Sequence, residues 1–409
     1  MDKLTAILAA SLLLVTPALA DPLRVRLDFG GNLDWAEADS IDAALGFQNR
    51  QSLDAKARLI WQGGPGAWGF EVQSLLSYQL GDDVGMAAAY AGLGPPAPPA
   101  SFFDLTSEIS SGTGHTLTHT LDRLSVSFAS ENMVLKVGRQ AVTWGSGMVF
   151  HPSDIIAPFA PDAVDTAYKP GVEILYGQYL FDNGNDLQAV FVPRRAIAGG
   201  PLDWQQSTLA LQAALLLGEL DGTVMLAQDH GDTLLNLGLG GPLAGAAWNV
   251  ELGQWFLADG DRPLNILVNI SNSGSIGDMN ITYFAEYFRN GFGVDTATPL
   301  DALPEALATR LATGQLFNVG QDFLALGGQL AVNAELTLSP SIITSLNDGS
   351  VFAGLYGNVS ASDNFDISFG ASQGFGASGT EFGGRETSAG SGVYVRAPLA
   401  VSLNLTRYF

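Results

Sequence analysis

Two short patterns contain residue types that could perform catalysis or bind a metal. The segment "GASQG" (370–374) places Ser372 in a G-x-S-x-G pattern, which presents a nucleophile where a strand turns sharply into a helix. No helix-forming stretch follows, so we interpret the match as a chance pattern among 49 glycines. His115 and His119 have the i, i+4 spacing of a metal-binding pair on a helix, but the neighbouring Gly and Thr residues favour a surface loop. We therefore predict no enzyme, no metal and no cofactor.

Charged residues at alternate positions of predicted strands could instead line a polar channel. If the polar strand faces point inward, the predicted pore-lining residues are Arg24, Arg26, Lys56, Arg58, Arg123, Lys136, Glu251, Glu286 and Glu335. The basic residues come from the first half of the chain and the acidic residues from the second half. We expect a basic wall opposite an acidic wall, with a field that would orient dipolar solutes. The alternative is that these charges pair across neighbouring strands.

The segments that carry these charges have the period of two that is typical of strands. In "LDAKARLIW" (53–61) and "PLNILVNIS" (263–271), apolar residues alternate with mostly polar ones. We interpret "GQLAVNAELTL" (328–338) in the same way, as one strand. Such repeats of about ten residues are typical of outer-membrane strands. Val268 would then face lipid and Asn269 the lumen.

The composition is compatible with a membrane protein that has no membrane-spanning helix. Hydrophobic residues make up 47% of the chain, yet no stretch after the first twenty residues reaches the ~20 apolar residues of such a helix. Only a closed β-barrel can then cross a bilayer, because every backbone polar group must be paired within it. A soluble acidic β protein is the alternative, and we favour the barrel because its strands alternate so regularly.

Turn lengths predict the topology of a single domain spanning residues 21–409. Short turns separate many predicted strands, and longer connections fall between them at 81–119, 144–170, 196–207, 290–321 and 374–390. This arrangement matches a barrel with short turns at one end and long loops at the other. We predict an all-β fold, a transmembrane antiparallel β-barrel of about 18 strands. Sixteen strands is the alternative, because Pro398 interrupts the predicted final strand, residues 391–409.

Both ends of the chain contain features of an exported barrel. Residues 1–20 combine Lys3, a short apolar run and Ala18-Leu19-Ala20, which predicts a signal peptide cleaved after Ala20. At the other end, "SLNLTRYF" (402–409) alternates towards Phe409. This ending resembles the carboxy-terminal assembly signal of Gram-negative outer-membrane proteins. The resemblance implies a location in the outer membrane, contact with its lipid, and recognition of Phe409 by the barrel-insertion machinery.

A central block, residues 137–174, resembles the G-R-Q…W-G…P-x-D…P-G pattern of some large, poorly characterised porin-like families. The matching residues include Gly138, Arg139, Gln140, Trp144, Gly145, Pro152 and Asp154. Residues 145–170 are too long for a hairpin turn and carry many apolar side chains. We predict that this segment folds inward as a constriction loop, with Asp154, Asp162 and Asp165 facing the basic wall. The alternative is a surface flap.

The sequence predicts a channel for the passive passage of small hydrophilic solutes or ions. The leucine spacing at 303–311 predicts a short amphipathic helix in the loop 290–321, at the outer mouth. A net charge of −23 disfavours nucleic-acid binding. A barrel hydrolase at the cell surface and a sealed structural or receptor barrel remain as alternatives. A monomer and a homotrimer are both compatible with the sequence.

Overall fold

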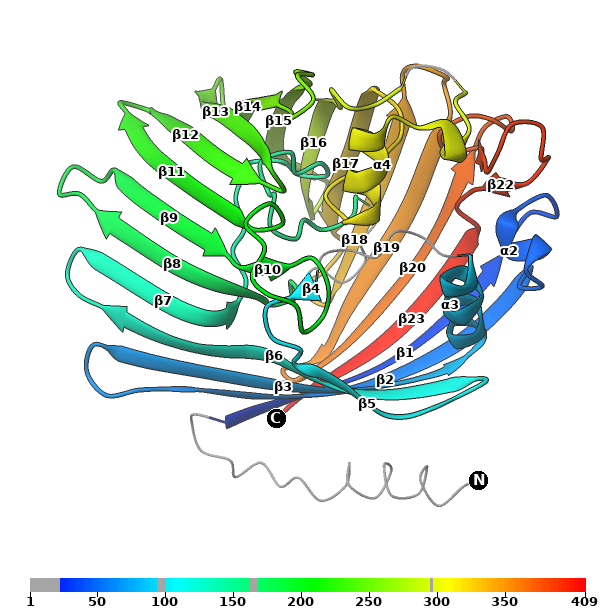
Figure 1. The fold of residues 1–409 in the computed structure, drawn as a ribbon, viewed down its shortest axis with the longest axis horizontal. Coiled ribbons are helices and arrows are strands. Elements are labelled where there is room, and N and C mark those ends of the chain that lie inside the picture. The colour runs from blue at the N-terminus through cyan, green and yellow to red at the C-terminus, as the bar shows by residue number, and fades with distance from the viewer. Residues whose placement is uncertain (1–22, 94–99, 162–167, 295–296) are drawn as a thin grey trace.

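The chain folds into a closed barrel of 18 antiparallel strands, seen in a computed structural model (Figure 1). The structure describes residues 23–93, 100–161, 168–294 and 297–409. The first strand pairs with both the second and the last, which closes the ring. The barrel strands are β1 (Leu23–Trp35), β2 (Asn49–Gly63), β3 (Trp68–Gly81), β6 (His115–Ala129), β7 (Met133–Gln140), β8 (Val172–Leu180), β9 (Asp186–Val192), β11 (Thr208–Leu217), β12 (Leu220–Asp229), β13 (Asp232–Leu243), β14 (Ala246–Phe256), β15 (Leu264–Ile276), β16 (Met279–Arg289), β17 (Asp322–Ala331), β18 (Leu336–Ser345), β19 (Val351–Ser362), β20 (Phe365–Phe375) and β23 (Leu399–Tyr408).

Short elements lie in the connections between barrel strands. β5 pairs with the part of β6 that extends beyond β7. The elements outside the barrel are α2 (Ile41–Ala44), α3 (Asp82–Gly92), β4 (Ala100–Ser101), β5 (Thr106–Gly112), β10 (Arg194–Arg195), η1 (Leu300–Ala302), α4 (Glu305–Ala312), β21 (Arg385–Glu386) and β22 (Tyr394–Val395). No helix in the described part of the chain is long and apolar enough to cross a membrane.

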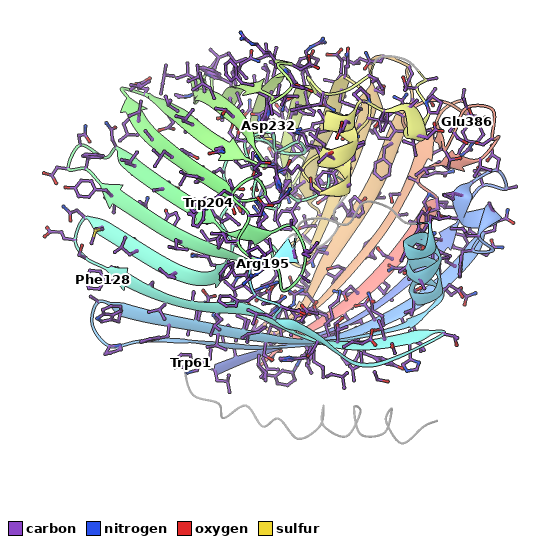
Figure 2. All side chains as sticks on the ribbon, viewed as in Figure 1. Trp61, Phe128, Arg195, Trp204, Asp232 and Glu386 are labelled. Carbon is purple, nitrogen blue, oxygen red and sulfur yellow. The ribbon has the colours of Figure 1, made fainter. Side chains whose placement is uncertain are left out.

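The alternation of side chains explains why these segments form a barrel wall. In β15, Val268 is 41% exposed on the outer face, whereas Asn269 is 1% exposed on the inner face. Leu237, Leu252 and Leu403 repeat this outward pattern on other strands. Aromatic side chains lie near strand ends on the outer face, including Trp61 and the Trp68–Phe128 pair (Figure 2). The barrel therefore presents an apolar surface with aromatic residues towards its margins, as outer-membrane barrels do.

The two ends of the barrel differ in the length of their connections, as predicted. At one end, here called the short-turn end, brief turns join the strands at residues 64–67, 130–132, 181–185, 218–219, 244–245, 277–278, 332–335 and 363–364. Most connections at the other end, here called the long-loop end, are longer and include residues 82–114, 141–171 and 290–321. The long loops and the elements within them therefore gather at one mouth of the barrel.

Two strand boundaries differ from the sequence prediction. The predicted strand 328–338 is divided by a turn at residues 332–335, where the Asn333 side chain accepts backbone N–H groups of Glu335 and Leu336. Glu335 therefore lies in a turn and not on a strand facing the pore. The final strand, β23, begins at Leu399, so Pro398 precedes it and removes no hydrogen bond from the ladder.

Much of the apolar packing lies inside the barrel. Ile155 and Ile156 of the connection 141–171 pack with buried residues of β9 to β14, such as Val192 and Trp255. A second cluster joins Val149 and Phe150 of the same connection to residues of β15 to β19. Residues 149–156 of the connection between β7 and β8 thus lie inside the ring of strands (Figure 1).

Candidate pore and its constriction loop

Residues 145–170 are here called the inward loop, and their described parts, 145–161 and 168–170, contact two different walls from inside the barrel. Phe150 stacks on Phe288 of β16, with ring centroids 4.7 Å apart. At its other end, the Tyr168 ring lies over Arg26 of β1 and Arg58 of β2, at 4.9 and 4.3 Å from the guanidinium carbons. The predicted loop carboxylates Asp162 and Asp165 lie outside the described residues. The described contacts place both described parts of the loop inside the barrel.

Glu286 of β16 fixes the first part of the inward loop. Its Oε1 accepts the backbone N–H groups of Val149 and Phe150 at 2.9 and 2.8 Å, and its Oε2 accepts that of Met148 at 2.6 Å. Oε2 also accepts the Asn269 side-chain amide at 3.1 Å. The side chain is 0% exposed. Because a buried carboxylate is costly without donors, these bonds tie the backbone of the loop to the wall.

Glu251 of β14 acts on the same part of the loop. It accepts the Ser146 N–H and hydroxyl groups and the Ser153 hydroxyl group, and it is 2% exposed. The predicted acidic wall of Glu251 and Glu286 is therefore covered by the loop and does not line open space. Both residues lie on the inner face of the wall, and the sequence could not show that backbone N–H groups of a distant loop would donate to their carboxylates.

A cluster of charges on the opposite wall receives the end of the inward loop. Arg58 and Arg123 both donate to Asp122, at 2.5 and 3.0 Å, and Arg123 also donates to the Lys169 carbonyl oxygen at 2.5 Å. A bulge between Gln73 and Ser74 in the β3–β6 ladder lets Asp122 join Arg123 on the inner face. The sequence analysis did not identify Asp122 as a residue of this site. The one feature that could have indicated it is its position next to Arg123, which was predicted to point inward.

Asp154 does not face the basic wall, contrary to the prediction. Its carboxylate is 4% exposed and accepts the Lys169 ammonium at 2.5 Å from within the same loop. Lys169 also donates to the Val142 carbonyl oxygen at 2.6 Å. Burial raises the pKa of Asp154 and lowers the pKa of Lys169, while their mutual attraction opposes both shifts. This pair closes the loop on itself, so Asp154 acts within the loop.

The residues of the G-R-Q block determine the conformation at the end of β7, directly before the inward loop. Gly138 has a φ of 124°, and a Cβ there would lie 2.1 Å from the Leu124 carbonyl oxygen. The turn of the backbone at Gly138 brings Arg139 to the inner side, where it donates to Glu173 at 2.9 Å. Gln140 donates to two carbonyl oxygens of β7 and β8. The block therefore sets the direction in which the chain leaves the wall.

The next residues of the block hold the root of the loop. The Trp144 indole is buried in the interior cluster and donates to Gln188 at 2.9 Å. Gly145 has a φ of 96° and lies beside Ser153 and Glu251, so a side chain there would be strained and crowded. Pro152 precedes Ser153 and borders a small cavity with Phe150 and Phe159. These contacts give each motif residue a local role in holding the loop.

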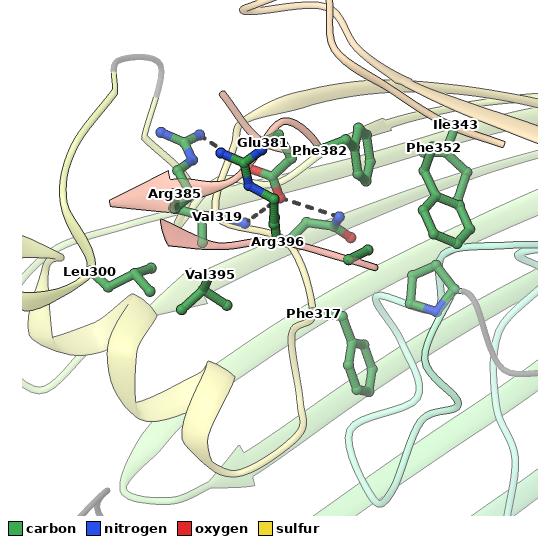
Figure 3. A pocket seen from close by; sticks show the side chains of 13 residues that line it. Leu300, Phe317, Val319, Ile343, Phe352, Glu381, Phe382, Arg385, Val395 and Arg396 are labelled. Atoms are coloured by element: carbon green, nitrogen blue, oxygen red, sulfur yellow. Dashed lines mark hydrogen bonds and ion pairs between the residues drawn. The ribbon is translucent and has the colours of Figure 1, made fainter. Parts of the chain in front are cut away.

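The loop between β16 and β17 adds a helix at the long-loop end, as the leucine spacing predicted. In α4, Leu307 is buried in the interior cluster, and Arg310 donates to Asp232 at 2.6 Å. Glu381 joins the end of this loop to the loop that precedes β23. It accepts the Val319 N–H at 2.9 Å and the Arg385 side chain at 3.1 Å, beside a pocket of about 220 Å³ (Figure 3). The long-loop mouth is thus narrowed by several connected segments.

A polar cavity of about 520 Å³ remains between the barrel strands on one side of the lumen. Side chains of β1, β2, β19, β20 and β23 line it, and they include Arg26, Asp28, Asp54, Lys56, Asn358, Asp366, Ser368, Ser402, Asn404, Thr406 and Tyr408. Of the predicted pore residues, Arg26 and Lys56 line this cavity. Arg24 is exposed two residues before Arg26 and donates to Gln62, and Lys136 is paired with Glu71 at 2.9 Å.

The two catalytic or metal-binding patterns lie in strands. Ser372 is within β20 and pairs with Gly354 and Ala400, so it does not stand on a strand-to-helix turn. His115 and His119 lie in β6 and not in a surface loop, and His119 is 2.8 Å from the Ser74 hydroxyl group. Over the described residues, no group of three or more His, Asp or Glu side chains could hold a metal ion.

Phe409 lies at the seam where the barrel closes. Its N–H donates to the Val25 carbonyl oxygen at 2.9 Å, and its carbonyl oxygen accepts the Val25 N–H at 3.1 Å. The predicted signal peptide, residues 1–20, lies outside the described residues. Phe409 therefore extends the pairing of β23 with β1 by one residue.

Solved structures with the same architecture place the fold among known barrels. No protein family and no curated protein matches the chain in sequence. Pseudomonas aeruginosa OccK5 (OpdH) is 11% identical and has a TM-score of 0.55, over 95% of this chain and 98% of that one. Acinetobacter baumannii OccAB3 is 10% identical and has a TM-score of 0.54, over 95% of this chain and 100% of that one. Pseudomonas aeruginosa OpdQ is 10% identical and has a TM-score of 0.53, over 96% of this chain and 99% of that one. At these identities the likeness concerns the fold, and the predicted closed all-β barrel is confirmed.

Proposed function

We propose that the protein is an outer-membrane channel for the passive passage of small hydrophilic solutes or ions. The observation that carries the proposal is the contrast between the two faces of the barrel wall. The outer face is apolar, whereas the inner face at the cavity carries charged, amide and hydroxyl side chains. An apolar belt stabilises the barrel in lipid, and a polar lumen gives water and solutes a path.

The inward loop supports a channel that is restricted and not wide. It is tied to one wall through Glu251 and Glu286, and its other end lies against Arg58 on the opposite wall. Loop residues fill much of the lumen with apolar contacts. Among the described residues, the polar cavity beside β1, β2, β19, β20 and β23 offers a path for solutes. The loop therefore acts as the constriction of the proposed channel.

The proposal includes four further points. The G-R-Q block supports a relation to porin-like families, because its residues direct and hold the constriction loop. Insertion into the outer membrane would use the barrel-insertion machinery acting on the last strand. Assembly as a homotrimer or a monomer can be distinguished by the mass of the detergent-solubilised barrel. We propose no catalytic activity, because Ser372 lies in mid-strand.

Single-channel recording in planar bilayers tests the proposal. Purified protein should produce steady ionic steps, and replacing residues 146–168 with a short Gly-Ser linker should raise the conductance while the barrel remains folded. Folding is checked by heat-modifiable migration on gels. Silence of both proteins would refute the channel and favour a sealed barrel. Silence together with esterase or protease turnover would favour the hydrolase.

A further inference from the structure

We propose that the passage favours cationic over anionic solutes, and that Asp366 is its specificity-determining residue. This inference rests on the proposed channel function. It differs from the expectation of opposed basic and acidic walls, because it depends on which charges of the lumen are left uncompensated.

The arginines of the first strands are not available to attract anions. Arg58 and Arg123 share Asp122, and Arg139 pairs with Glu173. The Tyr168 ring lies over Arg58, and the Lys169 carbonyl oxygen accepts from Arg123. Arg58 and Arg123 are also buried. Arg58, Arg123 and Asp122 together keep one net positive charge, but neither arginine lines the cavity, so the charge closest to a solute there is that of the lining groups.

The cavity itself holds three carboxylates and two cationic groups. Arg26 pairs with Asp28 at 2.8 Å, and Lys56 pairs with Asp54 at 3.2 Å. The remaining carboxylate is that of Asp366, near the start of β20. Among the described residues, no ion pair or hydrogen bond joins the Asp366 carboxylate to another group, whereas the Asp366 backbone pairs with β19 and β23. The lining therefore has one uncompensated negative charge.

The geometry of the cavity makes that charge effective. A cavity of about 520 Å³ keeps a solute close to its lining, and charges within about 10 Å of each other are incompletely screened at 0.1 M salt. The potential of Asp366 therefore reaches any solute that crosses the cavity. The other lining groups are amides and hydroxyls such as Asn358, Ser368 and Ser402, which can hydrogen-bond to a hydrated cation or to an ammonium group.

The short-turn end adds negative charge along the same path. Its turns carry the six exposed carboxylates of Glu131, Asp182, Glu219, Asp278, Glu335 and Asp363. Arg24 is an exposed basic side chain near this end and is hydrogen-bonded to Gln62. Rings of acidic residues raise the local concentration of cations at a pore mouth. The mouth and the cavity therefore favour the same sign of charge.

Reversal potentials measured across a KCl gradient test the inference. The wild-type channel should show a permeability ratio of K⁺ to Cl⁻ above one, and Asp366→Asn should lower the ratio at least twofold at low salt. Asp366→Lys should favour Cl⁻. The matched control is Asp259→Asn, because Asp259 is an exposed carboxylate in the loop between β14 and β15, at the opposite end of the barrel. It should leave the ratio unchanged.

The outcomes separate this inference from the channel proposal. Ionic steps with a wild-type ratio at or below one would overturn the cation preference. Steps with a ratio above one that Asp366→Asn and Asp366→Lys leave unchanged would overturn the role of Asp366. Absence of ionic steps from folded wild-type protein would refute the channel and the inference together. Heat-modifiable migration of each variant confirms that a change in the ratio does not come from misfolding.

Discussion

Replacing Glu286 with Gln should release the first part of the inward loop. The carboxylate accepts four hydrogen bonds, two at each oxygen. In Glu286→Gln one oxygen becomes an NH₂ group, which cannot accept, so two buried donors lose their partner. Each unpaired buried donor costs about 1–3 kcal/mol, or about 2–6 kcal/mol for the two. Since 1.4 kcal/mol is a factor of ten, the docked state of the loop should become at least about 30-fold less favoured.

Single-channel traces measure this change directly. Wild-type steps should be steady, whereas Glu286→Gln should show frequent excursions to a higher conductance while the loop is undocked. The matched control is Glu37→Gln, because Glu37 is an exposed glutamate in the connection between β1 and β2, away from the inward loop contacts of Glu286. This control should give wild-type traces. If Glu286→Gln and the control both gave steady wild-type steps, and the two had the same melting temperature, the hydrogen bonds of Glu286 would not be what holds the loop.

Two further substitutions and one deletion test the wall, the strand end and the seam. Val268→Arg should lower the free energy of unfolding, measured with urea in lipid, by about 2–4 kcal/mol, because Val268 faces the bilayer. The control Ser368→Arg, in the polar cavity, should change this free energy little. Equal losses in the two variants would contradict the assignment of the two faces. Gly138→Ala should lower the free energy of unfolding, measured by thermal melting, by about 1–3 kcal/mol, because the φ of Gly138 is 124°. The control Gly274→Ala should change it little, because a Cβ at Gly274 would meet open space. Deleting Phe409 removes two backbone hydrogen bonds at the seam and should lower the yield of heat-modifiable barrel, so an unchanged yield would argue against a role in closure.

The barrel could be predicted from the sequence because its signal is local. Each strand shows its two faces within about ten residues, and the long loops differ from the turns in length alone. The errors occurred where alternation continues across a turn. In residues 328–338 the alternating pattern runs through Asn333 to Glu335, yet the asparagine side chain closes a turn there. A period of two cannot distinguish one long strand from two strands joined by a tight hairpin.

The candidate site was predictable only in part. Placing Glu251 and Glu286 on inward faces required parity alone, and that placement agrees with their burial. What covers them depends on a loop about one hundred or more residues earlier in the chain, which no local pattern encodes. Asp154 was assigned to the pore because it is a charged loop residue, but Lys169 neutralises it within the same loop. Partners of buried charges are decided by tertiary packing.

The contacts of Glu286 also constrain the order in which the protein can fold. Met148 and Glu286 are separated by 138 positions in the sequence, and Ser146 and Glu251 by 105. Contacts with so large a separation form late, because the entropy of closing the intervening chain must be overcome first. Until β14 and β16 are in place, the inward loop has no acceptors for its backbone. Docking of the loop would therefore indicate that the wall containing β14 and β16 has formed. If assembly stopped before that point, Phe150 and Ile155 would remain accessible to proteases.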